Sequence, residues 1–133
     1  MGQRFLLDTN VLIQYLNNSL PPYAINAIQS LISKNLGNVC PIIEIELLAG
    51  TKSANDYASC LALLKLCSSL PIDDKTKEAA IKIRNEHRLK LPDCIIAATA
   101  QAHNLILLSA NKKDFSKIDN LQWLNPLEDE LSI

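Results

Sequence analysis

The amino-acid sequence predicts an α/β fold: a three-layer α/β/α sandwich around a central, mainly parallel sheet of four to five strands. Short apolar runs alternate with longer segments in which apolar residues recur at helical spacing. The segments between the runs are long enough for right-handed crossovers, which places helices on both faces of the sheet. The 133 residues contain no repeat and no long linker, so we expect a single domain over residues 1–133.

The expected strands are short. Residues 5–7 form an apolar run typical of a buried parallel strand, and residues 105–108 form the clearest strand of the chain. Weaker strands are expected at 39–40, 70–72 and 122–124. These five runs supply the sheet.

The expected helices lie between these strands and begin or end at recognisable residues. Pro21-Pro22 and Pro41 open two of them, and Gly50 ends the second. Asp73 or Asp74 caps another helix. The predicted ranges are 10–16, 22–34, 41–49, 55–67, 74–88 and 94–103.

Composition excludes several classes of protein. The net charge is −1, with 13 basic and 14 acidic residues, so the chain is no general polycation. It contains neither an apolar run long enough for a membrane span nor a secretory signal, and a cytoplasmic location is expected. The four cysteines form no C-x-x-C pair and are expected to be reduced core residues. Glycine-rich phosphate loops and the G-x-S-x-G elbow are also missing from the sequence.

Basic residues gather in two segments. The first contains Arg84 and Arg88, and the second contains Lys112 and Lys113. Such clusters are typical either of a solvated helix face or of a surface that steers phosphates, and the pattern alone does not separate the two.

Acidic and amide side chains follow the two strongest strands. Asp8 comes directly after residues 5–7, and Asn111 and Asp114 follow residues 105–108. The carboxyl ends of parallel strands meet at one edge of a sheet, where ligands usually bind. We therefore expect these side chains to lie near one another.

Two further acids are candidates for the same edge. Asp93 begins an almost wholly apolar helix, either as its N-cap or as an acid held at the mouth of a buried helix. Glu46 has apolar or small helical neighbours, but so does Glu44, about 200° away around the helix. Periodicity leaves these two glutamates as alternatives. Converging carboxylates would repel one another, and Mg²⁺ or Mn²⁺ would relieve that repulsion.

At this point the chain resembles the PIN-domain ribonucleases, specifically the VapC-type toxins of bacterial type II toxin–antitoxin systems. The matching segments occur in the family's order over nearly the whole chain: LLDTNVLI (6–13), ELLAG (46–50), LPDCIIAATA (91–100), LLSANKKDF (107–115) and LNP (124–126). The resemblance implies a PIN-like sandwich and a Mg²⁺-dependent (or Mn²⁺-dependent) endoribonuclease.

The resemblance also implies particular site residues. Asp8, Glu46 and Asp93 would be catalytic acids and metal ligands, which favours Glu46 over Glu44. The fourth family position falls on Asn111, which is neutral here and weakens the expected hold on a second metal ion. Ser109 matches a family position that often carries a hydroxyl. Beyond the resemblance, we expect Asp114 to supply a nearby charge, Thr9 and Asn10 to fix the loop that carries Asp8, and the basic residues Arg84, Arg88, Lys112 and Lys113 to guide the RNA.

The resemblance further implies a homodimer and a cognate antitoxin as partners. Residues 57–70 are a candidate surface for one of them, although plain core explains their apolar character equally well. The neutral Asn111 keeps an alternative function open: a catalytically weak PIN-like domain that binds RNA or protein.

Overall fold

A five-stranded parallel sheet forms the centre of the computed structural model, which describes residues 3–131. The strand order is β3-β2-β1-β4-β5, and every neighbouring pair is parallel. The strands are β1 (Phe5–Leu7), β2 (Gly37–Val39), β3 (Ser68–Ser69), β4 (Ile106–Leu108) and β5 (Trp123–Leu124). The predicted fold class is confirmed.

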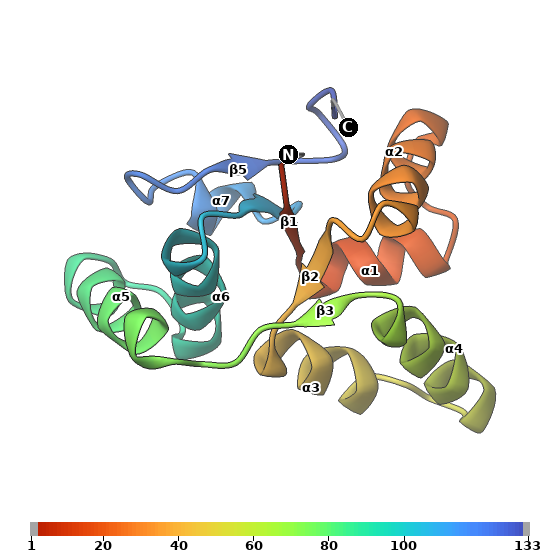
Figure 1. The fold of residues 1–133 in the computed structure, drawn as a ribbon, viewed down its shortest axis with the longest axis horizontal. Coiled ribbons are helices and arrows are strands. Elements are labelled where there is room, and N and C mark those ends of the chain that lie inside the picture. Colours follow the sequence, from red (N-terminus) through yellow and green to blue (C-terminus); the bar gives the residue numbers. More distant parts are fainter. Residues whose placement is uncertain (1–2, 132–133) are drawn as a thin grey trace.

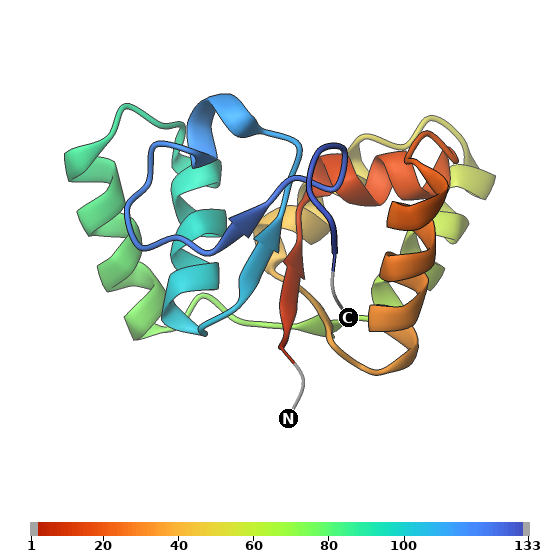
Figure 2. The ribbon, with the colours of Figure 1, turned by 90° about the horizontal axis from the view of Figure 1, so that it is seen from above.

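Helices cover both faces of this sheet. They are α1 (Thr9–Leu16), α2 (Pro22–Ser33), α3 (Pro41–Ala49), α4 (Ala54–Lys65), α5 (Asp74–Glu86), α6 (Leu91–Ala102) and α7 (Lys112–Phe115). Figure 1 shows α5 and α6 on one side of the sheet and α1 and α2 on the other. In Figure 2 the strands run upward, and α7 and the connection between α5 and α6 lie at the edge where the strands end.

The core explains why these elements form. All three residues of β1 are buried, as expected for a strand covered on both faces. The predicted burial of the apolar α6 is also observed, because six of its residues from Cys94 to Ala100 are buried. The four cysteines carry free thiols, and all except Cys67 are buried. Within the described residues, no helix has the length and apolar character needed to cross a membrane.

The sheet register sets the ends of β1 and β4 side by side. Leu7 pairs with Leu108, and the Asp8 amide donates to the Leu108 carbonyl over 3.0 Å. On the other side of β4, the Ser109 amide donates to the Leu124 carbonyl over 3.1 Å. Asp8 and Ser109, 101 residues apart in the sequence, therefore leave the sheet together.

Three local predictions differ from the structure. The strand expected at 70–72 is Ser68–Ser69, because Pro71 has no amide hydrogen for a ladder bond. The helix expected to reach residue 88 ends at Glu86, where His87 becomes extended. A short helix, α7, was not predicted; Asn111 caps it by accepting from the Asp114 amide.

The position of Asp93 in its helix is a fourth difference. The N-cap of α6 is Lys90, and Asp93 lies inside the first turn. Proline suits the first turn of a helix, where the missing amide hydrogen costs no intrahelical bond, so Pro92 belongs to α6 and does not precede it. The N-cap interpretation of Asp93 was therefore wrong.

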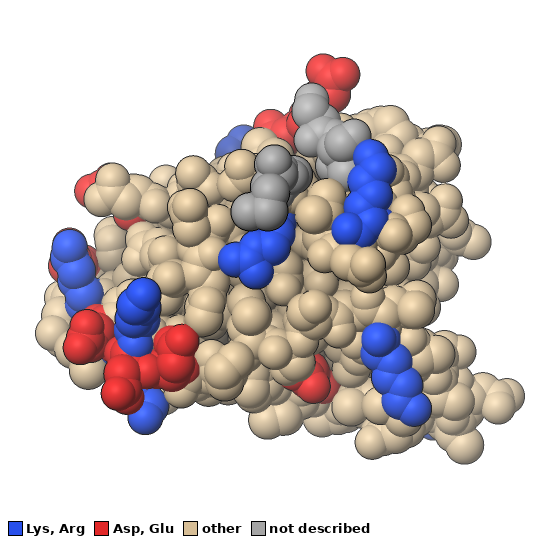
Figure 3. All heavy atoms as spheres, viewed as in Figure 1, with Lys and Arg blue, Asp and Glu red and all other residues tan. Residues whose placement is uncertain are grey.

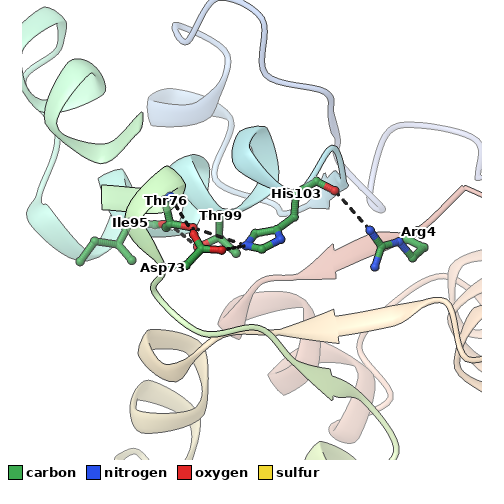
Figure 4. Close-up of polar contacts among 6 residues, drawn as sticks. All are labelled: Arg4, Asp73, Thr76, Ile95, Thr99 and His103. Carbon is green, nitrogen blue, oxygen red and sulfur yellow. Dashed lines mark hydrogen bonds and ion pairs between the residues drawn. The ribbon is translucent and has the colours of Figure 1, made fainter. Parts of the chain in front are cut away.

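A polar cluster joins α5 and α6 at the opposite edge of the sheet. Asp73 caps α5 by accepting from the amide (2.9 Å) and the hydroxyl (2.7 Å) of Thr76. The other Asp73 carboxylate oxygen lies 3.3 Å from Nε2 of His103, the C-cap of α6, as Figure 4 shows. The bonds from Thr76, together with the nearby His103, lower the pKa of Asp73. The two helix ends are thus tied far from the ends of the strands.

Charges on the face shown in Figure 3 are mixed in sign. Most of its acidic side chains gather over α5, beside basic ones. On α5, Lys77 and Asp74 form an ion pair 3.8 Å apart, and both side chains are largely exposed. Among the described side chains of this face, the basic ones are scattered and form no broad continuous surface.

Candidate active site at the carboxyl edge of the sheet

Asp8 is the centre of the candidate site. Its side chain is 5% exposed, directly beyond β1. Oδ1 accepts from the Thr9 amide over 2.8 Å, and Oδ2 accepts from the Ser109 hydroxyl over 2.7 Å. The Asn10 side-chain amide donates to the same Oδ2 over 3.2 Å. These bonds fix the orientation of the carboxylate.

Asn10 and Ser109 connect the β1 and β4 ends of the site. The Asn10 side-chain amide also donates to the Ser109 hydroxyl over 3.3 Å, and its carbonyl oxygen accepts from the Ala110 amide over 3.1 Å. The Ser109 hydroxyl in turn accepts from the Asn111 amide over 3.0 Å. The predicted supporting residues Asn10 and Ser109 therefore form one continuous hydrogen-bond network.

The structure separates the two candidate glutamates of α3. Glu46 accepts from the Thr9 hydroxyl over 2.8 Å, immediately beside Asp8. Glu44 points elsewhere and accepts from the Ser69 hydroxyl of β3. Glu46 is therefore the glutamate that faces the Asp8 site, and Thr9 connects the two acids.

Asp93, Asn111 and Asp114 approach from the other side. The Asn111 side-chain amide donates to Asp114 over 3.2 Å. The negative charge of Asp114 is the largest charge effect that raises the pKa of Asp93. Asp114 thus brings to this edge a negative charge that the neutral Asn111 lacks.

Burial and mutual repulsion shift the acid pKa values upward. Burial raises the pKa of Asp8 to about 6, although its bonds from Ser109 and Thr9 lower it; Asp93 and Glu46 add repulsion. Burial also raises the pKa of Asp93, with Asp114 and Glu46 contributing, while Lys90 opposes the shift. Clustered carboxylates that disfavour their own ionisation are typical of functional sites.

The donor chemistry of this edge fits a hard divalent cation. The converging groups are oxygen donors, which suit Mg²⁺ or Mn²⁺. Across residues 3–131, however, no three His, Cys, Asp or Glu side chains are grouped closely enough to hold an ion together. Mg²⁺ retains several waters and binds proteins through one or two carboxylates, so the arrangement suits a largely hydrated ion.

The four predicted RNA-binding residues occupy two places. Arg84 and Arg88 line one pocket near the start of α6, where Arg84 donates to the Leu89 carbonyl. Lys112 and Lys113 are exposed on α7, and Lys112 lies 3.3 Å from Glu128. Arg84 therefore shapes its loop, and Lys112 is paired with an acid.

Two residues near the site were not predicted to take part. Lys90 lies three positions before Asp93, and its charge lowers the pKa of that acid. The sequence did contain a sign of this contact, because Lys90 and Asp93 are separated by about one helical turn and Lys90 belongs to a cluster of basic residues. Trp123 donates its indole hydrogen to the Ser109 carbonyl over 2.9 Å and so supports the loop behind Asp8. The sequence offered no comparable sign for Trp123.

The sheet is parallel, and acidic side chains converge beyond its central strands. A comparison with known protein families agrees with this arrangement. The PIN domain profile matches residues 5–121, so the chain belongs to the PIN domain family. A comparison with curated proteins found no match.

Solved toxin–antitoxin structures share this fold. VapBC2 from Rickettsia felis bound to a promoter DNA fragment has a TM-score of 0.80 and 25% identity, covering 92% of this chain and 98% of that one. A toxin–antitoxin complex from Klebsiella pneumoniae has a TM-score of 0.76 and 31% identity, covering 93% and 98%. DNA-bound VapBC from Salmonella typhimurium shows the same fold at 21% identity, with a TM-score of 0.78 and coverage of 94% and 99%.

These neighbours agree with the VapC-type resemblance of the sequence motifs. Together with the family match, they support a nuclease of the toxin–antitoxin type.

Proposed function

We propose that this protein is a metal-dependent endoribonuclease that cleaves RNA phosphodiester bonds as the toxin of a toxin–antitoxin pair. The observation that supports this most is the coupling of Asp8, Glu46, Asp93 and Asp114 at one edge of the sheet. Asp8 also caps α1, but burial and the repulsion from Asp93 and Glu46 raise its pKa to about 6 and make its charged form unfavourable without a nearby cation. Asp8 is well suited to receiving a divalent cation.

Asp8 and Asp93 would hold Mg²⁺ or Mn²⁺, with Glu46 reaching the ion directly or through a water. A bound divalent cation lowers the pKa of a coordinated water and polarises the scissile phosphate. Asp8 contributes a carboxylate whose orientation is already fixed by Thr9, Asn10 and Ser109. Little ordering is therefore required when the substrate binds.

Glu46 is our first candidate for the general base, and Asp93 is the second. Glu46 is exposed, and the Thr9 hydroxyl holds one of its oxygens. Its free lone pairs can orient an attacking water and accept a proton from it. Ser109 and Asn111 support the acids by hydrogen bonding.

The second candidate function, a weakly catalytic domain that binds RNA or protein, is favoured by the neutral Asn111. A pure binding domain would keep its RNA affinity after Asp8 or Asp93 is neutralised and would cleave RNA in neither form. The charge of Asp114 beside Asp93 favours the enzyme over this alternative.

An antitoxin and a second copy of the chain are the proposed protein partners. Both would cover apolar surface. The described chain exposes large apolar side chains on α1, on α4 and at the C-cap of α4, including Ile13 (43%), Tyr57 (46%) and Leu66 (61%). The predicted surface at residues 57–70 is thus partly exposed, whereas Leu63 and Leu64 within it belong to the core.

Expression in growing cells tests the proposal. The native chain alone should arrest growth, the Asp8→Asn variant should not, and co-expression of the neighbouring antitoxin gene should restore growth. If the native and variant chains accumulate equally and are equally harmless, the toxin proposal fails.

A further inference from the structure

The connection between α5 and α6 forms a shallow, open pocket whose charged lining residues are all basic. Its volume is about 480 Å³, and its lining residues are Arg84, His87, Arg88, Leu89 and Lys90. Three of the five are cations and none is acidic. In a chain whose net charge is −1, this is a marked local excess of positive charge.

This basic pocket lies beside the candidate active site. Lys90 is the N-cap of α6, and Asp93 lies in the first turn of the same helix. Figure 2 shows the α5–α6 connection at the edge where the strands end.

The pocket is held in shape by bonds within the chain. Arg84 donates to the Leu89 carbonyl, and the Cys94 amide donates to the Lys90 carbonyl over 3.0 Å. These bonds fix the backbone that carries Arg88 and Lys90, so only their side chains lose freedom when an anion binds.

Two cations of the pocket are available to a ligand. Among residues 3–131, neither Arg88 nor Lys90 has an ion-pair partner within 4.0 Å. Both side chains are exposed. Lys112 on α7, by contrast, lies 3.3 Å from Glu128.

We propose that this pocket is a subsite for a backbone phosphate of the RNA strand, next to the scissile phosphate on the Asp93 side. Arg88 and Lys90 contact the phosphate, and Arg84 positions the loop. The inference rests on the proposed function and adds to it: the substrate must extend past the cleaved bond in the direction of α6. An acidic segment of a protein partner is the competing occupant.

RNA binding without cleavage tests this subsite directly. In the Asp8→Asn background, the affinity for a fluorescent single-stranded oligoribonucleotide is measured by anisotropy over a range of salt concentrations. Arg88→Gln and Lys90→Gln should each weaken binding about tenfold, the size of a charge-assisted hydrogen bond. The slope of log K against log salt should shrink by about 0.7 for each lost phosphate contact.

Two controls accompany these variants. Lys77→Gln removes the same charge from the far end of α5, where Lys77 faces Asp74, and should leave RNA affinity unchanged. Arg88→Lys keeps the charge and should restore most of the affinity. In the otherwise native enzyme, Arg88→Gln should raise KM while kcat changes little.

The subsite is refuted if Arg88→Gln and Lys90→Gln bind RNA as tightly as their parent, or no more weakly than Lys77→Gln. Loss of antitoxin affinity alone would assign the pocket to a protein partner and would also refute the proposal. A different result would refute the nuclease proposal but not the subsite. In that case the native chain would cleave no RNA, although Arg88→Gln and Lys90→Gln would still bind RNA more weakly than their parent.

Discussion

Replacing Asp8 with Asn should stabilise the metal-free protein at neutral pH. Folding raises the pKa of Asp8 from 3.8 to about 6, so the charged carboxylate is less favourable in the folded state than in the unfolded chain. A shift of about 2 units corresponds to roughly 3 kcal/mol. Asp8 is 5% exposed, so solvent screens little of this energy. Asn has nearly the same shape and carries no charge, but its Nδ2 cannot accept the bond that Thr9 or Ser109 donates to Asp8, and this loss offsets about 1–3 kcal/mol of the gain.

The pH dependence has a definite sign. Between about pH 4 and 6 the folded state binds more protons at Asp8 than the unfolded state does. This group's contribution to stability therefore falls as pH rises through that window and stays low above it. Asp8→Asn removes this slope, so its advantage grows to at most about 3 kcal/mol by pH 7.

Urea unfolding in the presence of EDTA, over a series of pH values, measures this difference. Asp119→Asn, which removes an exposed acid, should leave both the stability and the slope unchanged. Mg²⁺ should remove most of the difference in unfolding free energy between Asp8→Asn and the native chain. A ligand at 100 times its Kd adds about 2.7 kcal/mol to the stability of the protein that binds it, and only the native chain should bind the ion. If the stability of the native chain in EDTA does not fall relative to that of Asp8→Asn as the pH rises from about 4 to 7, Asp8 is not an electrostatically strained carboxylate.

Three further variants probe the surroundings of the site and the fold. Ser109→Ala removes a buried donor to Asp8; unfolding free energy should fall by about 1–3 kcal/mol, and the acid limb of the pH–cleavage profile should move to higher pH. Asp73→Asn should lower Tm above about pH 4, with the deficit shrinking in acid because the folded pKa of Asp73 is lowered; an equal deficit at every pH would exclude a charge effect. Glu128→Gln should release Lys112 and tighten RNA binding at low salt, and anisotropy showing unchanged affinity would place Lys112 outside the RNA path.

The position of Asp8 could be predicted because it depends on local sequence. A short apolar strand followed by polar residues places a side chain at the carboxyl edge of a parallel sheet, whatever the remaining structure. The meeting of Asp8 with Ser109 followed from topology, since β1 and β4 are parallel neighbours.

The choice between Glu46 and Glu44 could not be made from periodicity, because both have apolar helical neighbours. It depends on how α3 packs against α1 and β3, where Glu46 meets Thr9 and Glu44 meets Ser69. The family resemblance favoured Glu46, and the contact with Thr9 agrees with it.

The helix predicted at 94–103 starts three residues later than α6, because the sequence does not show whether Pro92 precedes the helix or lies in its first turn. Pro92 suits the first turn, so α6 begins with Leu91 and Asp93 lies within it. The ion pair between Lys112 and Glu128 could not be predicted from the sequence either, because it depends on the path of the chain after β5. Such contacts between a helix and a later loop leave no pattern in the local sequence.

Cleavage of single-stranded RNA by the purified chain, with Mn²⁺ or Mg²⁺ and with EDTA, tests the central claim most directly. We expect the native chain to cut only when the divalent ion is present, and Asp93→Asn to lose the activity while remaining folded. Cleavage that persists in EDTA, or that Asp93→Asn retains in full, would contradict the proposed metal site. The absence of cleavage by the native chain with either ion would contradict the nuclease itself.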